Sequence, residues 1–136
     1  MNNKLKYIDN AKSMELQTNV NQDSFLVIID GTEISSWTDY WNSISKAFCF
    51  PELPSYMQAN YHSYYDLMTD LTWLKKENIV LIIEHANAFL EHDLQLKNDI
   101  LNDFQDYLLP FWESEALEAV VNGKTKNFSI YLVKEN

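Results

Sequence analysis

The sequence has 136 residues, of which 46% are hydrophobic, so it favours a single folded domain with one hydrophobic core. Its formal net charge of −10, from 20 acidic and 10 basic residues, argues against direct binding to nucleic acid or an anionic membrane and suits a cationic partner. One cysteine excludes an intramolecular disulfide framework, two glycines exclude a glycine-rich phosphate loop, and no apolar run approaches the ~20 residues of a membrane span.

The N-terminal part of the chain is polar. Residues 1–22 are rich in Asn, Gln and Lys and lack strong periodicity, so we predict a polar extension with a loose turn of helix around Tyr7–Leu16. Residues 23–136 are predicted to form a single domain. Its first strand is Phe25–Ile29, a continuous apolar run that is typical of a strand buried on both faces and that ends at the turn signal Asp30-Gly31.

A helix and a loop are predicted next. The helix begins at a cap at Ser35 or Ser36. Its apolar residues recur at helical spacing and form one inner face, namely Trp37, Tyr40, Trp41, Ile44 and Phe48. Residues 49–59 are predicted to be a loop because Pro51 and Pro54 interrupt any helix there.

A second helix is predicted from Asn60 to about Leu74. Its inner face is apolar and aromatic, and consists of Tyr61, Tyr64, Tyr65, Met68 and Leu71. Its outer face is polar and acidic, and consists of His62, Asp66, Thr69, Asp70 and, at its end, Trp73.

The second half of the chain supplies two more strands, Ile79–Ile83 and Phe128–Val133. Between them lie a helical stretch from about Leu94 to Phe111, which Pro110 is predicted to end or kink, and a short helix over Ser114–Val121. Apolar strands separated by helices imply parallel pairing with right-handed crossovers. The predicted fold class is therefore α/β, a three-stranded parallel sheet packed with helices.

Catalytic and metal-binding chemistry has little support in the sequence. The three histidines lack the spacing of a metal site, so no metal and no cofactor are predicted. Cys49 stands between two phenylalanines and is predicted to be a small buried hydrophobic residue. Asp66 and Asp70 lie side by side on one predicted helix rather than across a cleft. A small acidic enzyme that uses these carboxylates stays an alternative, and it requires a concave pocket with converging carboxylates.

The outer face of the second predicted helix is the most informative feature. Its polar residues are flanked by aromatic ones, Tyr56, Tyr61, Tyr65 and Trp73. Tyrosine and tryptophan are enriched at protein interfaces, and acidic patches steer cationic partners. The face is therefore either a solvated surface with its tyrosines tucked into the core, or a binding patch for a basic protein.

The stretch from Leu53 to Leu74 carries a pattern of aromatic, acidic and apolar residues at fixed spacing. The positions concerned are Pro54, Tyr56, Asn60, Tyr61, Tyr64, Asp66, Asp70, Leu71, Trp73 and Leu74. In this pattern the sequence resembles the barstar-like ribonuclease inhibitors, and with its strands the resemblance covers roughly residues 25–134. Gln58, His62 and Leu67 replace the glycine, the acidic residue and the cysteine usual in that family, so barnase itself is not the expected partner.

The resemblance implies a non-enzymatic, cytoplasmic immunity protein that binds a basic ribonuclease toxin one to one. Asp66 would occupy the place of a substrate phosphate, and Asp106, or else Asp103, would supply a second acidic contact. The expected partner-binding residues are Tyr56, Asn60, Tyr61, His62, Tyr65, Asp66, Thr69, Asp70, Trp73 and Asp106. A scaffold or regulatory module that binds another basic protein would use the same surface and stays the alternative.

Overall fold

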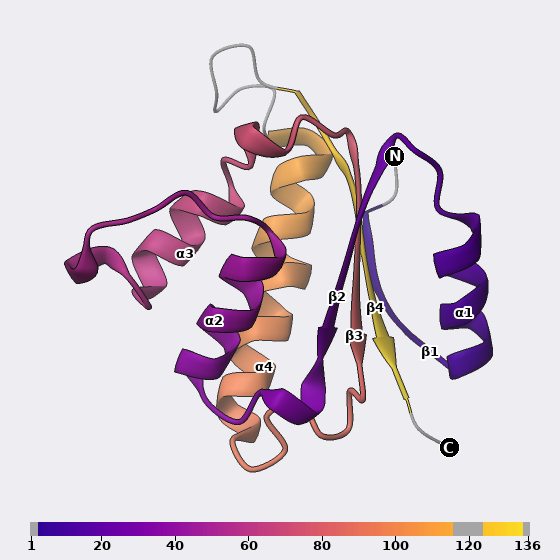
Figure 1. The fold of residues 1–136 in the computed structure, drawn as a ribbon, viewed down its shortest axis with the longest axis horizontal. Helices are drawn as coiled ribbons and strands as arrows, with labels where there is room; N and C mark the ends of the chain where they lie inside the picture. The colour runs from indigo at the N-terminus through magenta and orange to yellow at the C-terminus, as the bar shows by residue number, and fades with distance from the viewer. Residues whose placement is uncertain (1–2, 116–123, 135–136) are drawn as a thin grey trace.

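The computed structural model describes residues 3–115 and 124–134 and shows a parallel sheet with helices on both faces (Figure 1). The strands are β1 (Lys4–Ile8), β2 (Ser24–Asp30), β3 (Asn78–Glu84) and β4 (Asn127–Val133), in the spatial order β1-β4-β3-β2. The helices are α1 (Asn10–Asn19), α2 (Trp37–Ala47), α3 (Tyr61–Met68) and α4 (Leu94–Asp103). Helices α2, α3 and α4 lie on one side of the sheet, and α1 lies on the other. The predicted α/β class is confirmed.

The sheet has four strands rather than the predicted three. The additional strand, β1, lies within the segment predicted to be a polar extension, and it pairs in parallel with β4, where Ile8 lies opposite Val133. Ile8 is the one buried residue of β1 and packs with Ile82 and Tyr131. A short edge strand that buries one residue leaves no apolar run in the sequence, which explains why the pattern did not reveal it. Helix α1 follows directly, capped by Asp9.

The buried character of the strands depends on their place in the sheet. β3 and β4 are central, and most of their residues are buried, as predicted for apolar runs. β2 is an edge strand, so the expectation that it is buried on both faces is wrong. Val27 and Ile29 face the helices and are buried, whereas Ile28 is 40% exposed.

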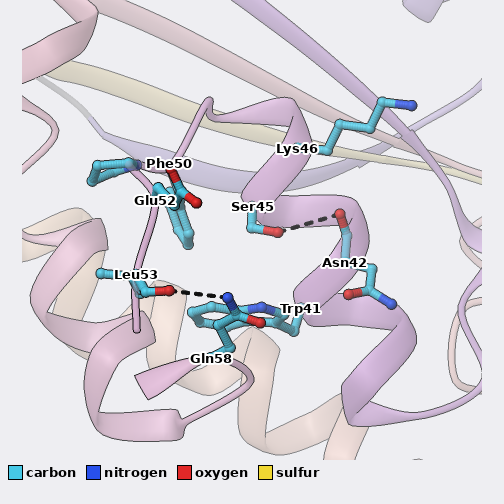
Figure 2. A pocket seen from close by; sticks show the side chains of 9 residues that line it. Trp41, Asn42, Ser45, Lys46, Phe50, Glu52, Leu53 and Gln58 are labelled. Atoms are coloured by element: carbon cyan, nitrogen blue, oxygen red, sulfur yellow. Dashed lines mark hydrogen bonds between the residues drawn. The ribbon is translucent and has the colours of Figure 1, made fainter. Parts of the chain in front are cut away.

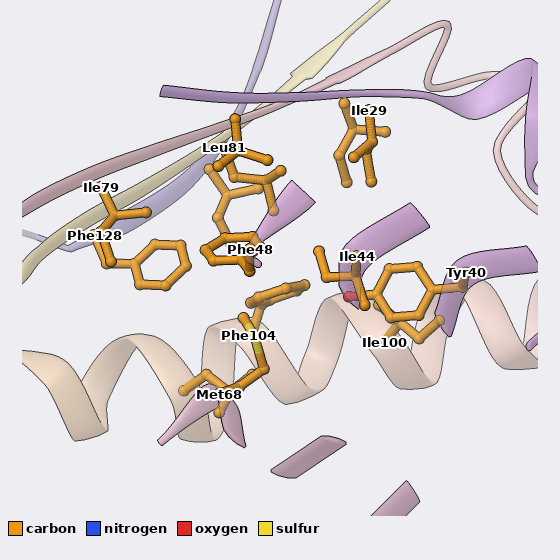
Figure 3. Close-up of a cluster of buried hydrophobic side chains, with 14 of the residues drawn as sticks. Ile29, Tyr40, Ile44, Phe48, Met68, Ile79, Leu81, Ile100, Phe104 and Phe128 are labelled. Atoms are coloured by element: carbon orange, nitrogen blue, oxygen red, sulfur yellow. The ribbon is translucent and has the colours of Figure 1, made fainter. Parts of the chain in front are cut away.

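The main core lies between the sheet and helices α2, α3 and α4 (Figure 3). Phe48, which follows α2, stacks on Phe128 of β4 with 6.0 Å between ring centroids. Phe104, which follows α4, contacts the same ring at 6.3 Å. All three phenylalanines are fully buried, so these aromatic contacts join two helices to the centre of the sheet.

Two of the predicted features after α2 differ in the structure. Helix α3 ends at Met68 rather than near Leu74, because Leu71 adopts a left-handed backbone conformation with φ of 53° that a right-handed helix cannot include. A single 3-10 turn over Thr72–Leu74 follows. Cys49 is exposed rather than buried, because its left-handed φ of 55° turns it away while Phe48 enters the core.

The helical stretch that begins with α4 passes through Pro110 instead of ending there. Wide turns of π type, Phe104–Leu108 and Phe111–Glu115, lie on either side of the proline. Such turns accommodate a residue that lacks a backbone donor. Most of the predicted short helix over Ser114–Val121, and the turn at Gly123, lie outside the described residues.

The hydroxyl groups of Tyr40 and Tyr64 form a buried hydrogen bond of 2.7 Å that joins α2 to α3. We expect Tyr64→Phe to lower the free energy of unfolding by about 1–3 kcal/mol, because it leaves the Tyr40 hydroxyl buried without its partner. Removing both hydroxyls in a Tyr40→Phe/Tyr64→Phe variant should cost less than the sum of the single changes. Urea unfolding of the four proteins checks this, and additive effects would contradict it.

Candidate partner-binding surface

Helix α3 begins where the sequence predicts, with Asn60 as its N-terminal cap. The side-chain oxygen of Asn60 accepts hydrogen bonds from the backbone N–H groups of His62, at 2.8 Å, and Ser63, at 3.3 Å. This cap satisfies two donors that the first helical turn would otherwise leave unpaired. Asn60 therefore fixes the start of the helix, whatever contact it makes with a partner.

His62 and Asp66 occupy the exposed side of α3, which we call the Asp66 face. They stand one helical turn apart, with 3.6 Å between His62 Nε2 and Asp66 Oδ2. Their side chains are 87% and 66% exposed, respectively. The Asp66 carboxylate is thus exposed to solvent.

Three indole groups hold the segments around α3 in place. Trp37 Nε1 donates to the carbonyl oxygen of Ala59, just before the helix, and Trp112 Nε1 donates to that of Met68, its last residue, both at 2.8 Å. Trp73 Nε1 donates to the carbonyl oxygen of Phe48, also at 2.8 Å. The bonds from Trp37 and Trp112 fix both ends of α3 against α2 and the wide turns that follow α4.

Tyr61 links α3 to two other helices. Its ring stacks on that of Trp37 with centroids 4.5 Å apart, and its hydroxyl donates to Asp103 Oδ2 at 2.8 Å. Burial raises the pKa of Tyr61 well above its usual value, and the bond to the Asp103 carboxylate raises it further. The hydroxyl therefore stays a donor at neutral pH and holds Asp103 beside α3.

Tyr65, Asp103 and Tyr107 form a second group beside the Asp66 face, which we call the Tyr107 cluster. The rings of Tyr65 and Tyr107 meet edge to face at 6.4 Å. Burial, then the charge of Asp103 and the neighbouring Tyr107, raises the pKa of Tyr65 to about 12. The sequence patterns did not indicate Tyr107, which is 60% exposed, because it lies outside the apolar period of this stretch and is not acidic. The signal in the sequence was that Tyr107 follows the acidic Asp106 directly and does not belong to the apolar face of the helical stretch.

The other predicted partner-binding residues fall into three groups. Tyr56, on the 3-10 turn Ser55–Met57, is 80% exposed, and Asp106 is exposed beside Tyr107. Thr69 and Asp70 follow the end of α3, where Thr69 Oγ1 donates to the Tyr65 carbonyl oxygen at 2.9 Å. Trp73 packs edge to face against Phe50 and contacts the core, so the expectation that it lies on an outer helical face is wrong.

Negative charge is concentrated in the segments that build this surface. Residues 47–74 and 98–115 of the sequence contain eight of the 20 acidic residues and none of the ten basic ones, so they carry −8 of the formal −10. The remainder of the chain is almost neutral. This uneven distribution favours a cationic partner for the side of the protein formed by α3 and α4.

Four tyrosines of this region should make stability sensitive to alkaline pH. Burial is the first cause that raises the pKa of Tyr40, Tyr61, Tyr64 and Tyr65. Above about pH 10 the unfolded chain loses tyrosine protons that the folded chain retains, so the free energy of unfolding should fall as pH rises. Well above pH 10, each of the fully buried Tyr40 and Tyr64 should lower the free energy of unfolding by about 1.4 kcal/mol per pH unit. Below about pH 9 these tyrosines should leave the free energy of unfolding independent of pH.

Urea unfolding between about pH 8 and pH 11 measures this dependence, and Tyr64→Phe should give a shallower decline above pH 10. A wild-type profile that stays flat to pH 11 would contradict the expectation.

A pocket of about 310 Å³ lies elsewhere, between α2 and residues 50–58 (Figure 2). Trp41 and Phe50 line it, and Gln58 Nε2 donates across its rim to the carbonyl oxygen of Leu53 at 3.0 Å. Its lining includes one carboxylate, Glu52, and not the converging pair that the enzyme alternative requires. Within residues 3–115 and 124–134, no group of three or more His, Cys, Asp or Glu residues is arranged to hold a metal ion.

Comparison with known proteins agrees with the resemblance seen in the sequence. A search of curated proteins found no match. None of the helices in the described ranges has both the length and the apolar character needed to cross a membrane. The family model described as Barstar (barnase inhibitor) matches residues 24–131, from the start of β2 into β4, and so includes α3 and the Tyr107 cluster. The chain therefore belongs to the Barstar (barnase inhibitor) family.

Proposed function

We propose that this protein is an immunity protein that inhibits a basic ribonuclease toxin in the cytoplasm. It binds the enzyme one to one and covers the active site with the Asp66 face. A ribonuclease active site is a cationic cleft that accommodates phosphate groups, and a carboxylate accepts charge-assisted hydrogen bonds from the same donors. Asp66 thereby takes the place of a substrate phosphate. Membership in a family of barnase inhibitors supports this class of partner.

The observation that carries the proposal is an exposed carboxylate on a firmly held helix. Asp66 is 66% exposed, while Trp37 and Trp112 fix the backbone at the two ends of α3. The surface that a partner binds is therefore already ordered before binding. Binding then costs less free energy than it would if the side chains and backbone of a flexible segment had to become ordered. The concentrated negative charge adds long-range attraction, which raises the association rate.

The test is a pull-down of the tagged protein from its source cells, followed by a ribonuclease assay on the proteins that co-elute. We expect a basic protein whose ribonuclease activity appears only after it is separated from this chain and disappears when purified chain is added back. The association rate should fall as salt is raised from about 50 to 500 mM, because salt screens the attraction. A stable partner without nuclease activity would overturn the proposal and favour a scaffold that binds another basic protein.

A further inference from the structure

Strand β2 forms one edge of the sheet, and it pairs with a neighbour on one side alone. The spatial order is β1-β4-β3-β2, and among the residues that the structure describes no strand lies beyond β2 (Figure 1). Proteins usually protect such an edge with charged side chains, proline or a bulge. Residues 25–29 of β2 include no charged residue and no proline, and their register with β3 is continuous. The backbone groups along this edge can therefore bind another strand.

The opposite edge of the sheet, β1, differs in this respect. Lys4 and Lys6 occupy two of its five positions, and both are exposed. A second strand that paired with β1 would bring its own side chains against these two charges, which disfavours the contact. The two edges are therefore unequal, and β2 is the edge that favours a partner strand.

The edge at β2 also carries an exposed apolar side chain. Leu26 and Val80 are partly buried and pack against the smaller core cluster on the face of the sheet where α1 lies. Ile28 follows Leu26 on that face, because side chains alternate along a strand, and it is 40% exposed. The apolar surface thus continues to the edge of the sheet, where a neighbouring strand would cover it.

We infer that a second copy of the chain pairs with β2, so that two β2 strands run antiparallel about a two-fold axis at Val27. Val27 is the middle residue of Ser24–Asp30, so this register pairs all seven residues of the strand. Directly opposite residues of antiparallel strands share a face of the sheet. Leu26 of each copy then lies opposite Ile28 of the other, and the two pairs cover the exposed Ile28 side chains.

The distribution of charge favours the antiparallel direction. At the end of β2, Asp30 lies beside Glu84 of β3. At its start, the Lys76 ammonium group donates to the carbonyl oxygen of Gln22 at 2.7 Å. The formal charges near that start cancel, and they belong to Asp23, Lys75, Lys76 and Glu77. Antiparallel pairing brings the carboxylates of each copy to the lysines of the other, whereas parallel pairing would bring like charges together.

Sedimentation equilibrium of the full chain tests this pairing. Between roughly 0.01 and 1 mM, the average mass should rise from the 16.0 kDa of one chain toward twice that value. Ile28→Lys should raise the dissociation constant of the dimer at least about tenfold, because it replaces both apolar pairs with buried charges. Met14→Lys is the matched control, because Met14 is also apolar and exposed but belongs to α1. A mass that stays at one chain, or equal dimerisation by Ile28→Lys, would overturn the inference.

Ile28→Thr is the second variant, for use if Ile28→Lys does not fold. Threonine keeps the β-branched shape that suits a strand and loses part of the apolar contact. It should raise the dissociation constant at least about threefold, and an unchanged constant would count against the pairing.

The distance between two spin labels tests the direction and register of the strands. In a Cys49→Ser/Asp23→Cys chain, each copy carries one nitroxide, four residues before Val27. Antiparallel pairing about Val27 separates the two labels by roughly 25–30 Å, whereas parallel pairing would bring them within about 15 Å. A measured distance outside the first range would overturn the inference. The proposed function is independent of this result, because it concerns α3 and is tested by the pull-down.

Discussion

Replacing Asp66 with alanine is expected to weaken the complex with the ribonuclease by about 2–5 kcal/mol. In the complex, the Asp66 carboxylate would be removed from water and paired with cationic groups of the enzyme, so its loss leaves those groups buried without a partner. Because the side chain is 66% exposed in the free protein, the free energy of unfolding should change by less than about 1 kcal/mol. Titration calorimetry and urea unfolding measure the two effects separately.

Asp23→Ala is the matched control for Asp66→Ala. It removes the same charge from an exposed position in the turn before β2, far along the chain from α3. The control should slow association slightly through the change in net charge and leave the dissociation rate unchanged. If Asp66→Ala costs less than about 0.5 kcal/mol of binding, which is the scale of a rim contact, Asp66 does not stand in for a phosphate.

Replacing Phe104 with alanine should have the largest effect on folding, a loss of about 3–5 kcal/mol of unfolding free energy. Phe104 is fully buried, contacts Phe128 of β4, and stands at the first residue of the wide turn. Its removal leaves a cavity between the helices and the sheet, and the close packing of the core limits how far neighbouring side chains can fill it. Urea or thermal unfolding measures this loss.

Gln105→Ala provides the control for Phe104→Ala, because Gln105 is the next residue in the same turn and is exposed. It should change the free energy of unfolding by no more than about 0.5 kcal/mol. A Phe104→Ala protein that loses less than about 1 kcal/mol would contradict the assignment of this ring to the centre of the core.

Local sequence patterns determined much of the architecture. The apolar runs over β3 and β4 mark central strands, because both faces of such strands are covered. Ser36 and Asn60 mark the starts of α2 and α3, because their side chains accept hydrogen bonds from the first helical turn. The spacing of residues between Leu53 and Leu74 indicated the family, and the exposed position of Asp66 follows from its place opposite the buried Tyr64 and Met68.

Contacts between distant segments decided the remainder. β1 is a strand because β4, more than a hundred residues later, supplies its hydrogen-bonding partners and buries Ile8. Trp73 contacts the core because the carbonyl group of Phe48 accepts its indole N–H. The Tyr107 cluster exists because Tyr61 and Tyr65 of α3 reach Asp103, at the end of α4, and Tyr107, in the turn after it, some 40 residues along the chain. The sequence by itself therefore determined the class of fold, the family and the exposed position of Asp66. The edge of the sheet and the second half of the candidate surface required the tertiary structure, because long-range pairing leaves no local period.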